Sequence, residues 1–415
     1  MVGIQRKQVM VGILLAGVLV SCTRPSQAND PSASGGLLTV GTSGAPPSAR
    51  AYAGVSWHTV QIPAAFGLSP LLAPTGNTLY MVGSTRVKTQ VQSASDAITK
   101  TQIWSSSDAT TWSQGKDPLI TDGFVPRALG TDGTGGLVLV GYVLASGDNV
   151  IPQIWHSSDG STFKAGQLAG SASILESTEI VSVASGSGVL VALGDHQGTG
   201  TYQGRDAWLS TDASSWTRVT LPQSAGYQAL SISAWSKGFA AVGVAGGKGT
   251  ASVWTSPDGA SWTKNADVDA VAISSIVAVG DRLVLLGAKA DSQLGMVPAS
   301  WLSSDGASWT ESSASGSEPA MEFDAATVVG GSILAIGTSH AAVPASTLRP
   351  DQSLPIPSFR AWLSADGLSW QILGSAPAFS LYQTSMTSFE GRPVVASTLQ
   401  SGVTVSVGDL TASGR

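Results

Sequence analysis

The stretch Ser300–Trp309, SWLSSDGASW, decides the fold of this chain. It contains a nine-residue pattern: Trp, any residue, Ser, any residue, Asp, Gly or Ala, any residue, Ser or Thr, and finally Trp or Phe. The pattern recurs at Trp104–Trp112, Trp155–Phe163, Trp208–Trp216, Trp254–Trp262 and Trp362–Trp370. Six copies of one pattern indicate a repeat protein, in which each copy marks one structural unit.

Each copy is predicted to form a strand, a tight turn and the start of a returning strand. Trp301 and Ser303 are two residues apart, so their side chains lie on one face of a strand. Asp305 and Gly306 form a turn dipeptide, because the carboxylate accepts backbone N–H groups and Gly tolerates positive φ. Two copies carry Ala109 and Ala213 in place of Gly, which suggests that positive φ is not obligatory there.

The repeated aspartates are predicted to be structural rather than catalytic. A protein normally carries one catalytic Ser–Asp pair, whereas this chain carries six. We therefore expect each carboxylate to hold its turn, and the Trp rings to fill space between neighbouring units. The aspartates of the pattern are Asp108, Asp159, Asp212, Asp258, Asp305 and Asp366.

The spacing of the copies predicts the architecture. The second aromatic of each copy falls at residues 112, 163, 216, 262, 309 and 370, and a half-copy, Ser56-Trp57, precedes them. Periods of about 40–50 residues that hold four short strands are typical of a β-propeller. Between copies the chain supplies apolar runs that end in Gly: LYMVG at Gly83, LVLVG at Gly141, LVALG at Gly194, FAAVG at Gly243, LVLLG at Gly287 and ILAIG at Gly337.

The last blade is predicted to be built from both ends of the repeat region. After Trp370 three strands follow, at Gln383–Ser388, Pro393–Thr398 and Gly402–Val407, whereas the outer strand is missing. Val55–Gln61 supplies it, and Thr404 and Ser406 take the places of Trp and Ser. The fold class is therefore all-β, a seven-bladed propeller of four-stranded antiparallel blades over residues 53–410, closed so that no blade edge is left unpaired at the join.

The pattern resembles the Asp-box, or BNR, repeat of sialidase-like propellers, with the consensus Ser/Thr-x-Asp-x-Gly-x-x-Trp. It departs from that consensus because Gly or Ala follows Asp directly. The resemblance covers the chain after about Ala53. It implies the propeller fold and leaves function open, because propellers of this type include glycosidases, receptors, assembly factors and binding modules.

The N-terminal segment is predicted to be a bacterial lipoprotein signal. Arg6 and Lys7 precede a short apolar run, Val9–Val20, and Leu19-Val20-Ser21-Cys22 matches a lipobox. Cys22, the only cysteine, is the expected lipidation site, so the protein would be anchored to the bacterial cell membrane on its extracytoplasmic side. Residues 23–52, rich in Ser, Pro and Gly, are predicted to form a flexible tether.

Composition limits the partners. Charged residues make up 12% of the chain and the formal net charge is −6, which argues against nucleic acid. The four histidines are scattered without the spacing of metal ligands. We expect no metal, no cofactor and a monomer, with a carbohydrate or an extracytoplasmic protein as the partner.

Candidate ligand-binding residues lie at the starts of the predicted inner strands, where a propeller has its entrance. The long loops Ser84–Gln102 and Thr338–Arg360 flank the closing blade on the same face. The candidates are Arg127, Glu179, Tyr227, Gln228, Asp324, Tyr382 and Gln383.

A catalytic function is the alternative. The resemblance to sialidases implies three convergent arginines, a Tyr nucleophile with a Glu partner and an acid/base Asp. Only Arg127 falls at a clear inner-strand start, so this set cannot be assembled. A carboxylate pair from Glu179 and Asp324 would still allow a glycoside hydrolase. The sequence therefore favours a non-catalytic binding propeller, with a sialidase-like hydrolase as the alternative.

Overall fold

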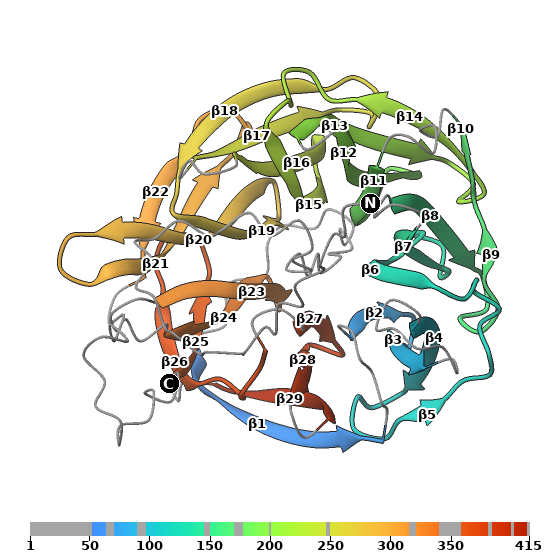
Figure 1. The fold of residues 1–415 in the computed structure, drawn as a ribbon. Helices are drawn as coiled ribbons and strands as arrows, with labels where there is room; N and C mark the ends of the chain where they lie inside the picture. Colours follow the sequence, from blue (N-terminus) through green and yellow to red (C-terminus); the bar gives the residue numbers. More distant parts are fainter. Residues whose placement is uncertain are drawn as a thin grey trace, which may run out of the picture.

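The computed structural model describes residues 52–63, 70–88, 97–144, 150–169, 177–198, 201–245, 250–314, 321–339, 358–380, 384–399 and 402–412. Within these residues the chain is all-β and contains no helix. Its strands form seven sheets arranged around a ring (Figure 1). The predicted seven-bladed propeller is confirmed.

Each blade has four antiparallel strands, which follow one another from the inner to the outer edge of the blade. Blade 1 has β2 (Leu71–Thr75), β3 (Thr78–Lys88), β4 (Ala97–Ser106) and β5 (Ser113–Gln114). Blade 2 has β6 (Phe124–Thr131), β7 (Leu137–Leu144), β8 (Val150–Ser157) and β9 (Lys164–Ala165). Blade 3 has β11 (Ser177–Gly186), β12 (Val189–Gly198), β13 (Thr201–Ser210) and β14 (Ser215–Thr220). Blade 4 has β15 (Tyr227–Trp235), β16 (Gly238–Ala245), β17 (Thr250–Ser256) and β18 (Thr263–Asp269).

The remaining blades follow the same order. Blade 5 has β19 (Ala272–Val279), β20 (Arg282–Asp291), β21 (Gly295–Ser303) and β22 (Thr310–Ser313). Blade 6 has β23 (Met321–Val329), β24 (Ser332–Ser339), β25 (Phe359–Ser364) and β26 (Gln371–Ser375). Blade 7 has β27 (Thr384–Phe389), β28 (Arg392–Leu399), β29 (Gly402–Ala412) and β1 (Tyr52–Ile62).

Blade 7 closes the ring as predicted, because β1 pairs antiparallel with β29. Ser406 lies opposite Val395 on one side and Thr59 on the other. In blade 4 the corresponding position is occupied by Trp254, which lies between Ala241 and Lys264. Ser406 therefore stands where the other blades have their first Trp, and Gly408 stands at the Ser position. The expectation that Thr404 and Ser406 fill these two places was wrong by two residues.

A strand that the sequence analysis did not anticipate joins two neighbouring blades. β10 (Gln167–Ala169) follows the outer strand of blade 2 and pairs in parallel with β14, the outer strand of blade 3. Blade 3 thereby becomes a five-stranded sheet. The addition covers part of an outer edge that would otherwise leave its backbone groups unpaired.

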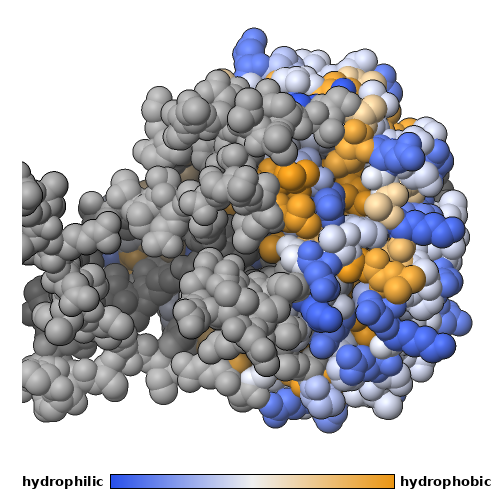
Figure 2. Space-filling model, turned by 45° about the vertical axis from the view of Figure 1, so that its right-hand side comes forward, coloured by the Kyte–Doolittle hydropathy of each residue, from blue (hydrophilic) through white to orange (hydrophobic). Residues whose placement is uncertain are grey.

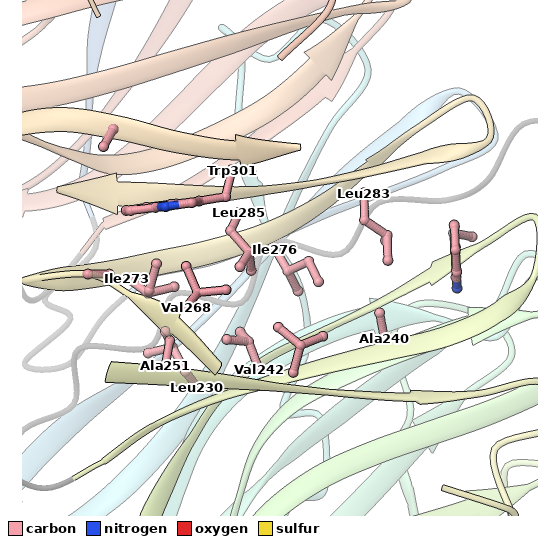
Figure 3. Packing of buried hydrophobic residues seen from close by; sticks show 14 residues of the cluster. Leu230, Ala240, Val242, Ala251, Val268, Ile273, Ile276, Leu283, Leu285 and Trp301 are labelled. Atoms are coloured by element: carbon pink, nitrogen blue, oxygen red, sulfur yellow. The ribbon is translucent and has the colours of Figure 1, made fainter. Parts of the chain in front are cut away.

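The hydrophobic core is divided among the interfaces between blades. Seven clusters of buried side chains lie in the described part of the ring, one at each interface. The cluster between blades 4 and 5 contains Leu230 and Val242 from one blade and Ile276, Leu285 and Trp301 from the next (Figure 3). Even at the closing blade, Val405 and Val407 pack with Leu72 and Trp104 of blade 1. Each blade thus depends on both neighbours for burial of its apolar faces.

The six Asp turns share one hydrogen-bond pattern. In the SWLSSDGASW stretch, Ser303 Oγ donates to Asp305 Oδ1 at 2.9 Å. The same oxygen accepts the backbone N–H groups of Ala307 and Ser308, at 2.8 and 2.7 Å. Equivalent bonds occur at Asp108, Asp159, Asp212, Asp258 and Asp366. These carboxylates stabilise the backbone, as the sequence analysis expected of them.

Positive φ is a property of all six turns. Ala109 and Ala213 adopt φ of 61° and 57°, beside 69–81° at the four glycines. The expectation that the alanine turns escape this conformation was wrong. Alanine is accommodated at a steric cost, whereas a Cβ atom at Gly306 would lie 2.6 Å from Thr255 Cγ2 of the preceding blade.

The glycine that ends each apolar run faces a β-bulge. In blades 2 to 6 the inner strand carries one extra residue directly after the position that pairs with this glycine. A Cβ atom at Gly337 would collide with the carbonyl oxygen of Glu322, and Gly141, Gly194 and Gly287 face the same obstacle on their inner strands. The bulge therefore explains why glycine recurs there.

The N-terminal predictions fall outside the described residues. These are the signal segment, the lipidation site Cys22 and residues 23–51 of the tether, whereas Tyr52, its last predicted residue, is the first residue of β1. Among the described residues, no helix is long and apolar enough to cross a membrane.

Candidate functional site

The entrance ends of the inner strands lie on the face opposite the Asp turns. Because neighbouring strands alternate in direction, the Asp turns share one face with the hairpins that join inner to second strands. The other face carries the starts of the inner strands. The candidates Tyr382 and Gln383 lie outside the described residues, as do residues 89–96 and 340–357 of the two long predicted loops.

Arg127 and Glu179 come together across two blades. Arg127 is the bulged residue of β6, and Glu179 lies near the start of β11. Arg127 Nη2 donates to Glu179 Oε2 at 3.2 Å, and the two side chains are 8% and 13% exposed. The guanidinium also lies 5.7 Å from the centre of the Tyr142 ring. This charge-assisted bond joins the inner strands of blades 2 and 3 at the entrance end.

Asp195 adds a buried carboxyl beside this pair. It lies opposite Glu179 on β12, and its side chain is fully buried. Its Oδ1 accepts the N–H of Ala229 at 2.6 Å and lies 3.8 Å from Arg205 Nη1, whereas Oδ2 is buried without a hydrogen bond. Burial raises the pKa of the Asp195 carboxyl to about 7; Arg205 opposes the rise and Glu179 adds to it.

Arg205 carries the network into blade 4. It pairs with Asp195 across β12 and β13, and its Nη1 donates to the carbonyl of Tyr227. The guanidinium lies 5.8 Å from the centres of both the Tyr227 and Trp254 rings. A Cβ atom at Gly243 would lie 2.5 Å from Arg205 Nε, so this glycine also makes room for the arginine.

Sequence reasoning missed Asp195 and Arg205, although a signal was present. Asp195 directly follows the Gly of LVALG, and Arg205 lies three residues before Trp208. Among the six apolar runs that end in Gly, LVALG is the one that an acidic residue follows. The register that places the two residues opposite each other depends on an irregularity between His196 and Gln197 in the β12–β13 pairing, which the sequence does not mark.

Tyr227 and Gln228 lie at the start of β15 and are half-buried. The Tyr227 ring packs edge-on against Trp254 at 5.5 Å, and its hydroxyl accepts a hydrogen bond from Lys264 Nζ at 3.3 Å. Lys264 belongs to the outer strand β18, so the Tyr227 side chain extends outward along blade 4. The structure thus brings Tyr227 to Arg205 rather than to the Arg127–Glu179 pair.

Asp324 lies far around the ring from Glu179. It is the bulged residue of β23, and its Oδ2 accepts the N–H and the hydroxyl of Thr338 at 2.8 and 2.9 Å. Two inner strands, β15 and β19, separate β23 from β11 in the order of the ring (Figure 1). The two carboxylates therefore serve different local hydrogen-bond networks.

Histidine does not form a metal centre in the part of the chain that the structure describes, where no group of three or more metal-ligating side chains occurs. His156 Nε2 lies 3.1 Å from Asp132 Oδ2, next to the turn that follows β6. The side chain of His196 and the whole of His340 lie outside the described residues.

Together these features define a seven-bladed β-propeller with a charged cluster at the entrance ends of blades 2 to 4. No protein-family model matches the chain, and no curated protein matches it either.

Solved structures similar to this chain include sialidases. Trypanosoma rangeli sialidase in complex with the inhibitor DANA is 11% identical over 84% of this chain and 59% of its own, with a TM-score of 0.44. The Hadza microbial sialidase Hz136 is 12% identical over 84% of this chain and 66% of its own, with a TM-score of 0.43. The chain thus spans about three fifths to two thirds of these sialidases. Similarity at this level says nothing about substrate or reaction.

Proposed function

We propose that this protein is a lipid-anchored, non-catalytic propeller that binds a carbohydrate or an extracytoplasmic protein at its entrance face. Cys22 carries the lipid, residues 23–51 are the tether, and the ring acts as a monomer outside the cytoplasm. The six turns are Asp-box repeats with the Gly moved next to the Asp. Nucleic acid is not a partner.

The observation that carries the proposal is the Arg127–Glu179 pair. Two adjacent inner strands present a guanidinium and a carboxylate within 3.2 Å of each other at the entrance end. A guanidinium offers several N–H donors and a carboxylate offers acceptors, the combination that sugar hydroxyls or peptide amides require.

The exposed surface agrees with a polar ligand. Among the described residues, the large hydrophobic side chains that are exposed, Leu119, Val271 and Ile372, belong to separate blades or connections. On the side of the ring seen in Figure 2, apolar patches are interleaved with polar residues. Such a surface favours recognition through a few polar contacts over docking on one broad apolar patch.

The alternative, a sialidase-like glycoside hydrolase, requires two carboxyl groups about 5–10 Å apart on either side of the bond to be cleaved. Glu179 is ion-paired to Arg127, and Asp324 is hydrogen-bonded to Thr338 on an inner strand that is not adjacent. This arrangement favours binding over hydrolysis.

The function is tested by a glycan-array and peptide-array binding screen beside a panel of fluorogenic glycosides. We expect binding without turnover, weakened at unchanged melting temperature by Arg127→Lys, which keeps the charge and removes the planar donor set. Lys237→Arg, a cation change at an exposed position in the β15–β16 hairpin on the opposite face, is the matched control and leaves binding intact. Turnover that disappears in Glu179→Gln would instead establish the hydrolase.

The anchor is tested separately by membrane fractionation of Cys22→Ala. We expect the variant to leave the membrane fraction, because the apolar run Val9–Val20 is too short to span a membrane comfortably and the variant carries no acyl chains. A variant that fractionates like the wild type would remove the lipid anchor from the proposal and leave the binding function untouched.

A further inference from the structure

Four charged side chains form a continuous row across the entrance end of blades 2 and 3. Arg127 contacts Glu179, Glu179 lies opposite Asp195, and Asp195 lies opposite Arg205. The signs along the row are positive, negative, negative and positive. Its two central members are carboxyl groups on neighbouring strands, and one of them is fully shielded from solvent.

Blade 4 is attached to the end of this row. The Ala229 N–H donates to Asp195, and the Tyr227 carbonyl accepts from Arg205. Beyond Arg205 lie the rings of Tyr227 and Trp254, and Lys264 contacts the Tyr227 hydroxyl. Thus the groups facing Asp195 are Glu179 from β11, Arg205 from β13, the Ala229 amide from β15 and, further along, Arg127 from β6.

We propose that this row is a proton-sensitive latch between blades 3 and 4, with Asp195 as the residue that gains or loses the proton. When Asp195 is neutral, its repulsion with Glu179 is absent, and Arg205 is held by the Tyr227 carbonyl and the two rings. When Asp195 loses this proton to water, the new carboxylate repels Glu179 and attracts Arg205. The bonds that Arg205 and Asp195 make to the backbone of Tyr227 and Ala229, at the start of β15, then change in strength.

The latch goes beyond ligand binding and requires no ligand for its operation. It also explains why charged residues are kept where two other blades have apolar ones: the cross-strand pair that corresponds to Asp195 and Arg205 is Val244 with Ala251 in blade 4 and Ala288 with Pro298 in blade 5. Burying such groups is costly, so retention of a pair whose charge can change is consistent with a switch.

The test follows the backbone amide of Ala229, because its N–H reports the charge of the carboxyl that it contacts. The amide signal of the ¹⁵N-alanine-labelled full-length protein is recorded by NMR between pH 5 and 9. We expect a single transition with a midpoint near pH 7, absent in Asp195→Asn. Glu179→Gln removes the neighbouring negative charge and should move the midpoint to lower pH.

The control is Glu311→Gln, which breaks an ion pair with Lys289 in blade 5 and should leave the midpoint unchanged. If Asp195→Asn does not fold, the comparison of wild type with Glu179→Gln decides alone. A wild-type signal without a transition in this range, or a midpoint unmoved by Glu179→Gln, would overturn the latch. Failure of the glycan and peptide screens would not affect it.

Discussion

Thr59 Oγ1 and Ser406 Oγ lie 2.7 Å apart although 347 residues separate them in the chain. They face each other across β1 and β29, the strands that complete blade 7. At this position the other blades carry a Trp, so the closing blade replaces a large ring with a pair of hydroxyls that hydrogen-bond directly across the join.

Removal of the closing strand should destabilise the whole ring. Deletion of residues 402–415 removes Val403, Val405 and Val407, which are each at most 1% exposed. The side chains that pack against these valines then become exposed to solvent. At about 1.5–3 kcal/mol per buried side chain, we expect a loss of about 5 kcal/mol or more. Urea unfolding measures the loss, and deletion of residues 413–415 alone is the control. Equal stability of the two deletions would contradict closure.

Asp305→Ala should lower the free energy of unfolding by about 1–3 kcal/mol, because the N–H groups of Ala307 and Ser308 lose their acceptor. Asp281→Ala, at an exposed position in the β19–β20 hairpin, should have little effect. Chemical denaturation of both variants measures the difference. A loss confined to ligand binding, with stability intact, would show that the Asp turns serve function directly.

Gly306→Ala should destabilise more than Gly280→Ala. Both glycines have positive φ, 76° and 61°, so both variants incur a backbone cost of about 1 kcal/mol. Only at Gly306 does the new methyl group meet a neighbour, Thr255 Cγ2 at 2.6 Å, which adds about 1–3 kcal/mol. Thermal unfolding of the pair isolates the steric part, and equal melting temperatures would argue against tight packing of the turn on blade 4.

The stability difference between wild type and Asp195→Asn should depend on pH. Because the pKa of Asp195 is raised to about 7 in the folded protein, folding favours its protonated form. The stability that protonation of Asp195 contributes is fully present below its unfolded pKa near 4. Between pH 4 and 7 this stability falls by about 1.4 kcal/mol per pH unit, and above pH 7 the free energy of unfolding no longer changes with the titration of Asp195. Urea unfolding at several pH values measures the difference, and a constant difference from pH 4 to 8 would be the contrary result.

The architecture could be predicted because its signals repeat. Six copies of the Trp–Ser–Asp pattern and six apolar runs ending in Gly define the blades, and the incomplete last unit predicts where the ends meet. The reason for the recurring glycines was not predictable, because the bulge opposite Gly337 arises from the inner strand and leaves no sequence mark of its own. Likewise, the positive φ of Ala109 becomes evident only from the turn geometry.

The candidate site was only partly predictable, because each of its residues occurs in a single blade. The inner-strand rule located Arg127 and Glu179 correctly at the entrance end, and the structure adds the ion pair between them. Tyr227 also lies at the start of an inner strand, yet its side chain contacts Arg205 and Lys264 rather than the Arg127–Glu179 pair. A periodic signal fixes where a strand begins, whereas the direction of one polar side chain depends on partners from other strands.

The pairing of β1 with β29 also sets a time order for making the protein. Strands are produced one after another, and β1 is among the earliest segments of the ring to emerge, whereas β29 is the last. Until residue 412 has left the ribosome, β1 has no partner strand, and blades 6 and 1 have no complete blade between them. A chain that stops before that point forms an open ring, whose two terminal blades expose apolar faces that proteases and chaperones can bind. Closure of the ring therefore distinguishes complete from truncated chains, because only a chain that includes β29 can bury the faces of blades 6 and 1 that border blade 7.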